Sequence, residues 1–322
     1  MLTVQNLSVS FDTRRGLVQV IEDLSFRVEA GRTLGIVGES GSGKSVTSLA
    51  IMGLLPPTAR VTSGVITFDN KNLLKSSESE LQELRGSRIA MIFQDPMTSL
   101  NPSFTVGFQI IEAMKAHGIK GDLNAKALEI LKQVGIPDPQ MRLNSYPHQL
   151  SGGMSQRVMI AMAIACEPEL LIADEPTTAL DVTIQAQILA LLKKLQAERK
   201  MGLILITHDI GVVAQMADDI LVLYAGHAME LGPKEQVIKN PRHPYTKALL
   251  ASLPGSHGLS EFRTRLPTIA GLVPDLLKRP SGCQLNPRCE YAVDRCRAEV
   301  PKVNEIDSAK VKCHIPLEIN HR

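Results

Sequence analysis

The sequence predicts an α/β fold built on a largely parallel sheet. Three observations lead to this prediction. A glycine-rich loop stands between a buried strand and a helix at residues 32–51, and an apolar strand at residues 170–173 ends in two acidic residues. Strand and helix patterns also alternate over about residues 1–232. Such alternation favours parallel pairing, because each parallel connection needs a long crossover that is usually a helix.

The glycine-rich loop is Gly38-Glu39-Ser40-Gly41-Ser42-Gly43-Lys44-Ser45, between a strand at 32–37 and a helix at 46–51. Glycines let backbone N–H groups converge on phosphate oxygens, and the helix N-terminus adds partial positive charge. Lys44 is expected to reach the β and γ phosphates of a nucleotide, and the Ser45 hydroxyl is expected to bind Mg²⁺. The residues assigned to the nucleotide are Gly38, Ser40, Gly41, Ser42, Gly43, Lys44 and Ser45.

The second apolar strand, at residues 170–173, ends in Asp174 and Glu175. Four consecutive apolar residues predict a strand buried on both faces, and ligands of parallel sheets bind at the carboxyl ends of such strands. Asp174 is expected to hold Mg²⁺ through water, and Glu175 is expected to act as general base on an attacking water. Two acids after a strand are, taken alone, equally typical of a solvated strand end. The upstream phosphate loop favours the catalytic interpretation.

Between these two segments stands Leu150-Ser151-Gly152-Gly153-Met154-Ser155-Gln156. It opens a helix predicted over residues 156–165, so its backbone N–H groups and the helix dipole form a second anion site. Ser151 is also typical of a helix N-cap, and the two interpretations do not compete. One nucleotide cannot lie on two separate helix N-termini of one compact domain. The second site is therefore expected to serve a nucleotide held by another subunit.

In this order, the three segments resemble the ATP-binding cassette of the ABC transporter family. The resemblance implies an ATPase with a P-loop sheet, an ABC-type antiparallel β subdomain and an inserted helical subdomain. It also implies a head-to-tail dimer with two ATP sites, in which the middle segment closes over ATP bound to the opposing subunit. The residues assigned to that contact are Ser151, Gly152, Gly153 and Gln156.

Four further residues stand where the family has functional side chains. Phe11, at the end of the first strand, is placed like the aromatic residue that stacks on adenine. Gln94 follows the apolar strand 89–93 and resembles the glutamine that senses Mg²⁺ and water. Asp181 resembles an aspartate that faces the partner subunit, and His208 resembles the histidine on the γ-phosphate. A lone phenylalanine or histidine is more often structural. Phe11 and His208 are assigned to the site only because each stands at the position, relative to the other motifs, where the family has a functional side chain.

Composition excludes several classes of protein. At 322 residues, the chain is long enough for one large domain and an extension. The net charge of +2 gives no reason to expect nucleic acid as a partner. No apolar stretch approaches the ~20 residues that span a bilayer, and the N-terminus enters a strand without the pattern of a secretory signal. A role at the membrane is therefore expected to come through bound partners.

The pattern along the chain predicts two domains. Residues 1–232 are expected to form the nucleotide-binding domain. Within it, the alternation of strands and helices is interrupted by helices alone, at 106–115 and 124–134. We interpret this interruption as the helical subdomain of the cassette, at about residues 95–165.

Residues 233–322 are expected to form a C-terminal extension of different character. Ten of the chain's nineteen prolines lie there, and periodicity fades apart from a short helix at about 246–251. Arg242-His243-Pro244-Tyr245-Thr246 resembles the motif of the oligopeptide and dipeptide transporter branch of the ABC family. Asp95-Pro96-Met97-Thr98-Ser99-Leu100-Asn101-Pro102, directly after Gln94, resembles the same branch.

The resemblance implies the ATP-hydrolysing subunit of a bacterial importer of dipeptides or short peptides. The expected partners are a second, homologous ATPase subunit in a head-to-tail heterodimer, two membrane-spanning permease subunits and, indirectly, an external peptide-binding protein in the periplasm or outside the cell. The expected location is peripheral, on the cytoplasmic face of the inner membrane. A homodimer remains open.

The substrate stays open at this point, because an ATPase subunit of this kind touches no peptide. Longer oligopeptides, antimicrobial peptides and nickel chelates are alternatives. A soluble ABC ATPase without a transporter is an alternative from another class. Such proteins usually carry two cassettes or a long coiled coil, whereas this chain has one cassette and no sustained heptads.

Four of the five cysteines lie in the extension: Cys283, Cys289, Cys296 and Cys313. Disulfides are not expected, because the cytosol keeps thiols reduced. We expect a metal centre and favour a [4Fe–4S] cluster, since zinc usually takes closely spaced Cys pairs and these gaps are wider. Zn²⁺, or no metal, remains an alternative, and the centre is either structural or a redox or iron sensor. Cys166, on an apolar helix end, is expected to be a core residue.

Overall fold

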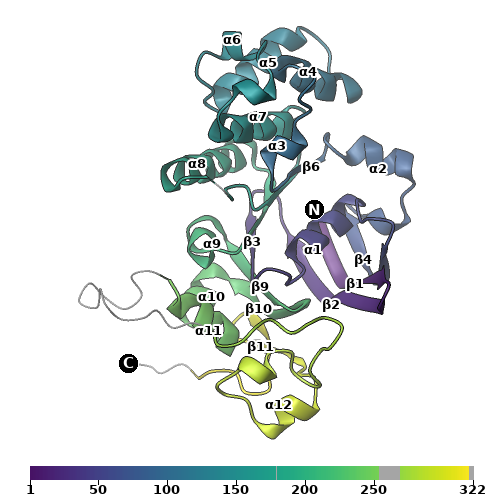
Figure 1. Cartoon of the computed structure of the whole chain (residues 1–322), viewed down its shortest axis with the longest axis vertical. Helices are drawn as coiled ribbons and strands as arrows, with labels where there is room; N and C mark the ends of the chain where they lie inside the picture. Colours follow the sequence, from purple (N-terminus) through teal and green to yellow (C-terminus); the bar gives the residue numbers. More distant parts are fainter. Residues whose placement is uncertain (179, 254–268, 319–322) are drawn as a thin grey trace, which may run out of the picture. The chain divides into compact units, whose positions relative to one another are not determined.

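The computed structural model describes residues 1–178, 180–253 and 269–318 (Figure 1). The chain divides into two compact units. Unit 1 comprises Met1–Arg27, Thr33–Leu74 and Thr207–Arg322, and unit 2 comprises Val28–Arg32 and Lys75–Ile206. Both units combine strands with helices, which confirms the predicted α/β class. Among the described residues, no helix is long and apolar enough to cross a membrane.

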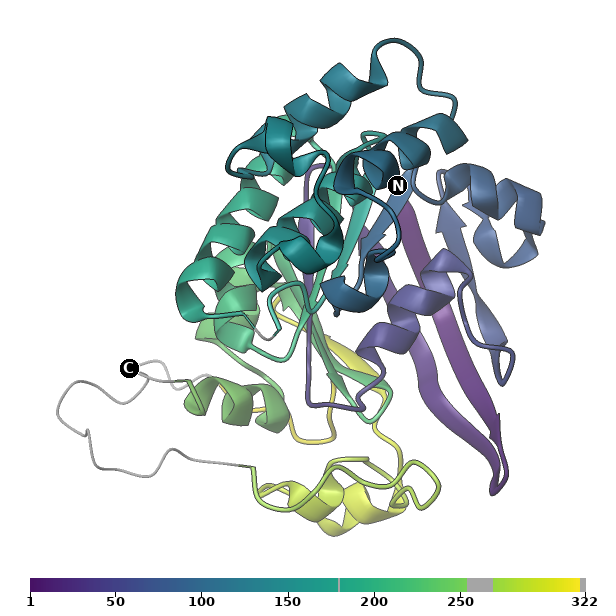
Figure 2. The same ribbon diagram turned by 45° about the horizontal axis from the view of Figure 1, so that its top comes forward.

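Unit 1 contains a four-stranded sheet. Its strands are β1 (Leu2–Thr13), β2 (Gly16–Val28), β4 (Ala59–Phe68) and β5 (Lys71–Asn72), in the order β2-β1-β4-β5. β1 and β2 form a long hairpin, seen in purple in Figure 2. β4 runs antiparallel to β1, with Leu2 opposite Phe68. Leu2 and Val4 are buried while Gln5 is exposed, because successive side chains of a strand point to opposite faces.

A second sheet of unit 1 carries the phosphate loop. Its strands are β3 (Thr33–Val37), β9 (Asp219–Tyr224), β10 (His227–Pro233), β11 (Val303–Ile306) and β12 (Ala309–Lys312), in the order β11-β12-β10-β9-β3. β3 and β9 are parallel, and the other neighbours are antiparallel. All five residues of β3 are buried, as the apolar run at the start of the loop predicts.

Seven helical segments accompany these sheets in the described part of unit 1. They are α1 (Lys44–Met52), η1 (Leu73–Lys75), α9 (Ile210–Met216), α10 (Lys234–Lys239), α11 (Pro244–Ala251), η3 (Asn286–Arg288) and α12 (Asp294–Ala298). α9 packs against β3 at Gly35, where an added Cβ atom would lie 2.3 Å from Cγ1 of Val213. The missing side chain lets the helix approach the strand that leads into the phosphate loop.

Unit 2 is built on three parallel strands. They are β6 (Ile89–Ile92), β7 (Leu170–Asp174) and β8 (Gly202–Thr207), with β7 in the middle. Every residue of the three strands is buried. The helix α8 (Val182–Arg199) connects β7 to β8, as parallel pairing requires. The carboxyl ends of β6 and β7 consequently lie at the same edge.

The remaining helices of unit 2 are α2 (Glu78–Leu84), α3 (Pro96–Ser99), α4 (Val106–Ala116), α5 (Leu123–Gln133), α6 (Pro139–Arg142), η2 (Pro147–Gln149) and α7 (Gly152–Ile164). α4 and α5 confirm the helices predicted at 106–115 and 124–134. Each starts where a side chain caps it: Thr105 accepts from the N–H of Phe108, and Asp122 accepts from the N–H of Ala125. α7 packs against α3, α4 and α5, which joins the insertion into one helical layer.

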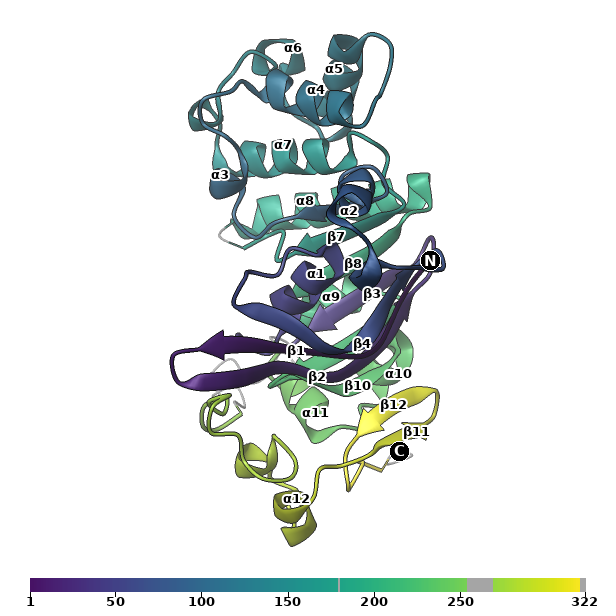
Figure 3. The same cartoon turned by 90° about the vertical axis from the view of Figure 1, so that its right-hand side faces the viewer.

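The C-terminal extension contains more regular structure than the sequence predicts. Besides α11, which confirms the short helix expected at about 246–251, it forms α10, η3, α12, β11 and β12. β12 pairs with β10, and Figure 3 shows it (yellow) beside that strand. Tyr245, Cys283 and Leu285 share a hydrophobic core with Val222 and Tyr224 of β9. The sequence shows no periodicity at β11 and β12, because strands of four residues are too short to give a periodic signal.

Candidate active site

The phosphate loop of unit 1 connects β3 to α1. Gly43, the N-cap of α1, has φ +101°, a left-handed conformation that favours glycine. A Cβ atom on Gly38 would lie 2.1 Å from the carbonyl oxygen of Leu223, so the loop needs glycine there for space. Nζ of Lys44 donates to the carbonyl oxygens of Gly38 (2.8 Å) and Glu39 (3.1 Å). The loop therefore wraps the lysine ammonium next to a helix N-terminus, which is the arrangement of an anion site.

The other loop residues divide into exposed and structural ones. Ser40 and Gly41 are exposed, and Ser45 is half-buried in the first turn of α1. Ser42 is buried: its N–H donates to the carbonyl oxygen of Glu39 (3.2 Å), and its own carbonyl accepts from Gly226 (3.0 Å). Ser40, Gly41 and Ser45 are thus accessible from solvent, while Ser42 holds the shape of the loop.

Phe11 and His208 also belong to unit 1. Phe11 is half-buried in β1 and pairs with Ala59 of β4. His208 is exposed after β8, and the next residue, Asp209, caps α9 by accepting from the N–H of Gly211 (2.8 Å). The assignments of Phe11 to adenine and of His208 to the γ-phosphate stay predictions.

Gln94 and Glu175 meet in unit 2, beyond the carboxyl ends of two neighbouring strands. Nε2 of Gln94 donates to Oε2 of Glu175 (3.2 Å), and Oγ1 of Thr178 donates to the same oxygen (3.0 Å). Asp174, the last residue of β7, is only 5% exposed, whereas Glu175 is half-buried. Donors from Gln94 and Thr178 orient the Glu175 carboxylate. Sequence reasoning missed Thr178, although its position three residues after Glu175 was a usable signal.

The segment at residues 150–156 forms the start of α7. The helix begins at Gly152, not at Gln156 as predicted, because Ser151 is the N-cap: its Oγ accepts from the N–H of Met154 (3.4 Å). Ser151 and Gly152 are exposed, so backbone N–H groups at this helix N-terminus face solvent. Gln156 is 2% exposed, and its Nε2 has no hydrogen-bond partner among the described residues. It lies in the packed part of the helix, and its role toward a nucleotide stays a prediction.

Asp181 takes a similar position at the next helix. It is exposed and caps α8, with Oδ1 accepting from the N–H of Ile184 (2.9 Å). Ala179, two residues earlier in the same predicted segment, lies outside the described residues. The predicted contact of Asp181 with a partner subunit stays a prediction.

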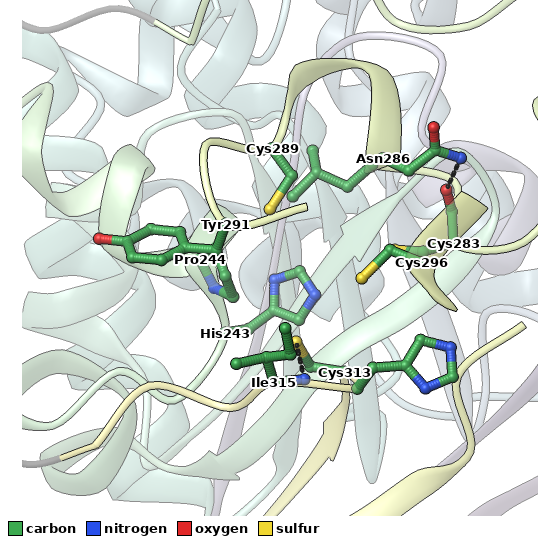
Figure 4. A pocket seen from close by; sticks show the side chains of 11 residues that line it. His243, Pro244, Cys283, Asn286, Cys289, Tyr291, Cys296, Cys313 and Ile315 are labelled. Carbon is green, nitrogen blue, oxygen red and sulfur yellow. Dashed lines mark hydrogen bonds between the residues drawn. The ribbon is translucent and has the colours of Figure 1, made fainter. Parts of the chain in front are cut away.

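The four cysteines of the extension line one small cavity, together with His243 (Figure 4). The cavity measures about 10 Å³, which is room for about one water molecule. All four thiols are free, and the N–H of Cys283 donates to the carbonyl oxygen of Cys296 (2.8 Å). Burial raises the pKa of Cys283 and Cys289. These thiols stay protonated at neutral pH unless a positive charge lies beside them.

The structure does not confirm a metal centre in this cavity. Among the described residues, no group of three or more His, Cys, Asp or Glu lies in position to hold a metal ion. The set of four thiols is nonetheless of the type that binds iron–sulfur clusters or zinc. Cys166, in unit 2, lies two residues after the end of α7 and is half-buried rather than fully in the core; its Sγ lies 3.7 Å from the carbonyl oxygen of Ala113.

Large apolar side chains are exposed on segment 93–108 of unit 2. Phe93, Met97, Phe104 and Phe108 are each between 40% and 52% exposed. The rings of Phe104 and Phe108 stack with their centroids 4.5 Å apart. Exposed apolar groups of this size are typical of a surface that another protein covers.

A glycine-rich loop around Lys44, a glutamate held by Gln94 beyond neighbouring parallel strands, and a capped Ser-Gly-Gly helix start together define an ATP-binding cassette. The profile of the family described as ABC transporter matches residues 21–178, and the one described as oligopeptide/dipeptide transporter, C-terminal region, matches residues 229–296. The chain belongs to the ABC transporter family of ATP-binding proteins, and its enzymatic activity is ATP hydrolysis of the ABC type.

Similar curated proteins are named as peptide-transport ATP-binding proteins. The chain is 55% identical to the dipeptide transport ATP-binding protein DppD of Haemophilus influenzae, over 98% of this chain and 96% of that protein. It is 52% identical to DppD of Bacillus subtilis, over 97% and 94%. The oligopeptide transport ATP-binding protein OppD of H. influenzae is 47% identical over 99% and 98%.

Among solved structures, the chain is similar to the ATP-binding cassette MJ0796 in a dimeric post-hydrolysis state bound to ADP and phosphate. The identity is 28% and the TM-score 0.66, over 73% of this chain and 99% of that one. The cassette fold predicted for the first part of the chain is thereby confirmed.

Proposed function

We propose that the chain is the ATP-hydrolysing subunit of a bacterial importer of dipeptides and short peptides. The observation that carries this proposal is the 55% identity to dipeptide transport ATP-binding proteins, which runs through both the cassette and the C-terminal region. In the proposed division, residues 1–232 bind and hydrolyse ATP and residues 233–322 form the extension of the peptide-transporter branch.

In the proposed reaction, the backbone N–H groups of the phosphate loop and the Lys44 ammonium bind the β and γ phosphates. Ser45, Asp174 and Gln94 would hold Mg²⁺, which neutralises phosphate charge when bound. Glu175 accepts a proton from the attacking water, whose oxygen bonds to the γ-phosphorus while the bond to the bridging oxygen of the β-phosphate breaks. The hydrogen bonds from Gln94 and Thr178 support this role, since they orient the accepting carboxylate.

The proposed assembly contains a second, homologous ATPase subunit. Ser151, Gly152 and Gly153 would then contact ATP on the partner's phosphate loop in a head-to-tail dimer, and Asp181 would face the partner. The exposed N-terminus of α7 supports this proposal, because its free N–H groups can bind an anion from outside the chain.

Two membrane-spanning permease subunits complete the assembly at the cytoplasmic face of the inner membrane, and an external peptide-binding protein delivers the substrate. The exposed apolar side chains on segment 93–108 are the proposed docking surface for a short permease helix. A cysteine at Ser103, which is exposed within this segment, should crosslink to a permease subunit in the assembled complex. The matched control is a cysteine at the exposed Lys193 of α8; crosslinking from both positions, or from neither, would reject the docking surface.

The substrate class is tested by uptake. Cells that lack this chain should lose uptake of a labelled dipeptide and regain it with the wild-type chain but not with Glu175→Gln. The 47% identity to an oligopeptide transport protein keeps longer peptides as a second candidate. Restored uptake of a pentapeptide but not of a dipeptide would favour that candidate. Antimicrobial peptides and nickel chelates should also be tested as competitors of labelled dipeptide uptake. In a separate experiment, failure of the chain to co-purify with membrane subunits would favour a soluble ATPase.

We also propose that Cys283, Cys289, Cys296 and Cys313 bind a [4Fe–4S] cluster. Their convergence on one cavity supports this, although the cavity must widen to accept a cluster. When bound, the cluster would tie together the parts of the extension that carry the four thiolates. Protein purified without oxygen should be brown and contain iron and sulfide, and Cys289→Ser should lose both. Cys166→Ser is the matched control. Colourless protein with stoichiometric zinc would replace the cluster by zinc, and protein without metal would refute both.

A further inference from the structure

Glu39 is the one acidic residue of the phosphate loop, and the C-terminal extension holds its carboxylate. Nη1 of Arg288 lies 3.1 and 3.0 Å from the two carboxylate oxygens of Glu39. The Arg288 side chain is only 6% exposed, against 28% for Glu39. The same Nη1 donates to the hydroxyl of Tyr224 (3.1 Å). The ion pair is thus mostly shielded from solvent, where it is stronger than a surface pair.

The rest of the Arg288 guanidinium is fixed by the extension itself. Its Nε donates to the carbonyl oxygen of Ala270 (2.9 Å), and its Nη2 donates to that of Ile269 (3.1 Å). Arg288 ends η3, directly before Cys289. The position of the charge that faces Glu39 is therefore set by the fold of the extension.

Tyr245 holds the backbone of the same loop residue. The N–H of Glu39 donates to the Tyr245 hydroxyl (3.0 Å), and Tyr245 is 1% exposed. Tyr245 lies in the first turn of α11, which is anchored because the buried Glu230 accepts from the N–H groups of Arg242 (2.8 Å) and His243 (3.0 Å). The Arg242-to-Thr246 motif therefore helps to hold the backbone of the phosphate loop in place.

From these contacts we infer that Arg288 and Tyr245 are positioning residues for ATP binding, and that they act through Glu39. Resting on the proposed function, this inference concerns the phosphate loop as the ATP site. An uncompensated carboxylate in an anion-binding loop repels phosphate, and Arg288 removes that repulsion. Tyr245 fixes the peptide that precedes the N–H groups of Ser40 and Gly41. ATP affinity then depends on a segment 206 to 249 residues away in the sequence.

A double-mutant cycle that neutralises each charge tests the role of Arg288 in the full chain. The dissociation constant of ATP is measured by equilibrium titration. Arg288→Gln should raise this constant about tenfold, the scale of one charge-assisted contact. Glu39→Gln removes the charge that Arg288 neutralises, so the double variant Arg288→Gln/Glu39→Gln should return to within about threefold of wild type. Arg288→Lys keeps the charge but loses the planar guanidinium with its several donors, so its dissociation constant for ATP should be intermediate. Arg295→Gln removes an exposed arginine of the same extension and is the matched control.

The Tyr245→Phe variant provides a second test if the arginine variants fold poorly. It keeps the ring in the core and removes the hydroxyl that contacts both the N–H and the side chain of Glu39. The ATP dissociation constant should therefore rise about fivefold, with little change in the turnover rate of saturated enzyme. Tyr291→Phe, at a more exposed tyrosine of the extension, is its control.

Each outcome decides the inference. Rescue of Arg288→Gln by Glu39→Gln, together with weaker binding by Tyr245→Phe, supports it. Unchanged affinity in both Arg288→Gln and Tyr245→Phe overturns it, and so does weak binding that Glu39→Gln does not restore, because the ion pair would then be a structural tie only. Wild-type chain that binds no ATP would instead refute the proposed function, which separates the two failures.

Discussion

Two buried histidines of unit 1 should make the protein less stable in mild acid. His227 and His243 are 2% and 1% exposed. Burial lowers the pKa of both to about 3, and for His227 the charges of Lys312 and Arg279 add to the effect. Lys312 lies 3.0 Å from Nδ1 and Arg279 3.0 Å from Nε2, so protonation would bring three positive charges together. The Glu22 carboxylate, 3.5 Å from Nε2, opposes this but is outnumbered.

The sign and size of the effect follow from the lowered pKa. The unfolded chain binds more protons than the native chain between the native pKa of about 3 and the unfolded value of 6.5, so stability is lost as the pH falls through this range. At about pH 5, each histidine should lower the free energy of unfolding by about 2 kcal/mol relative to pH 7.5. The value at pH 5 depends on the unfolded pKa alone, provided that the native pKa stays below about 4.

Tyrosine fluorescence can follow this loss during urea unfolding. The chain has no tryptophan, and three of its four tyrosines lie in unit 1 with both histidines. Between pH 7.5 and pH 5, the free energy of unfolding of His227→Gln should fall by about 2 kcal/mol less than that of wild type. Other groups that titrate in this range, such as Glu230, whose pKa is raised by burial, affect both proteins equally and cancel in the comparison. The same substitution at the exposed His148 is the control. Equal losses in wild type and His227→Gln would show that His227 is protonated in the native state, which would refute the reasoning.

Three further predictions concern the loop and the general base. Lys44→Ala should abolish ATP binding in equilibrium titration, because it removes the charge aimed at the phosphates. Glu175→Gln should keep ATP binding and lower the hydrolysis rate at least about 100-fold; hydrolysis at the native rate would remove Glu175 from the role of base. Gly38→Ala should weaken ATP binding and destabilise the chain by about 1–3 kcal/mol in thermal unfolding, since its Cβ would lie 2.1 Å from a backbone oxygen. Gly152→Ala, whose nearest neighbour would be at 4.0 Å, should not lower the melting temperature.

The predictions from sequence are most accurate where the signal is local. The strand expected at 32–37 is β3, and the strands that end at Asp174 and before Gln94 are β7 and β6. The hydrogen bond between Gln94 and Glu175 goes beyond these predictions and follows from the parallel pairing of β6 with β7 at one sheet edge. α7 starts four residues before its predicted start, because two glycines weaken the helical signal of a first turn that the Ser151 cap stabilises.

Sequence reasoning fails where contacts connect distant segments. Nothing near Glu39 indicates that its partners are Tyr245 and Arg288, since the pairing depends on how the extension packs on β9. The geometry of the four cysteines is a second case. Their sequence spacing suggests a metal centre, but only the packing of the extension decides how close the sulfur atoms lie.

The pairing of β12 with β10 has a consequence for how far the chain can be shortened. β10 ends at Pro233, so a chain cut after residue 232 would keep almost all of β10 and lose the strand that covers its outer edge. The N–H and C=O groups of Glu230 and Leu231 would then be available to pair with a strand of another chain. The same cut would uncover the apolar side of β9, where Val222 and Tyr224 now contact the extension. A minimal cassette trimmed to the domain boundary suggested by sequence should therefore aggregate through an unprotected sheet edge.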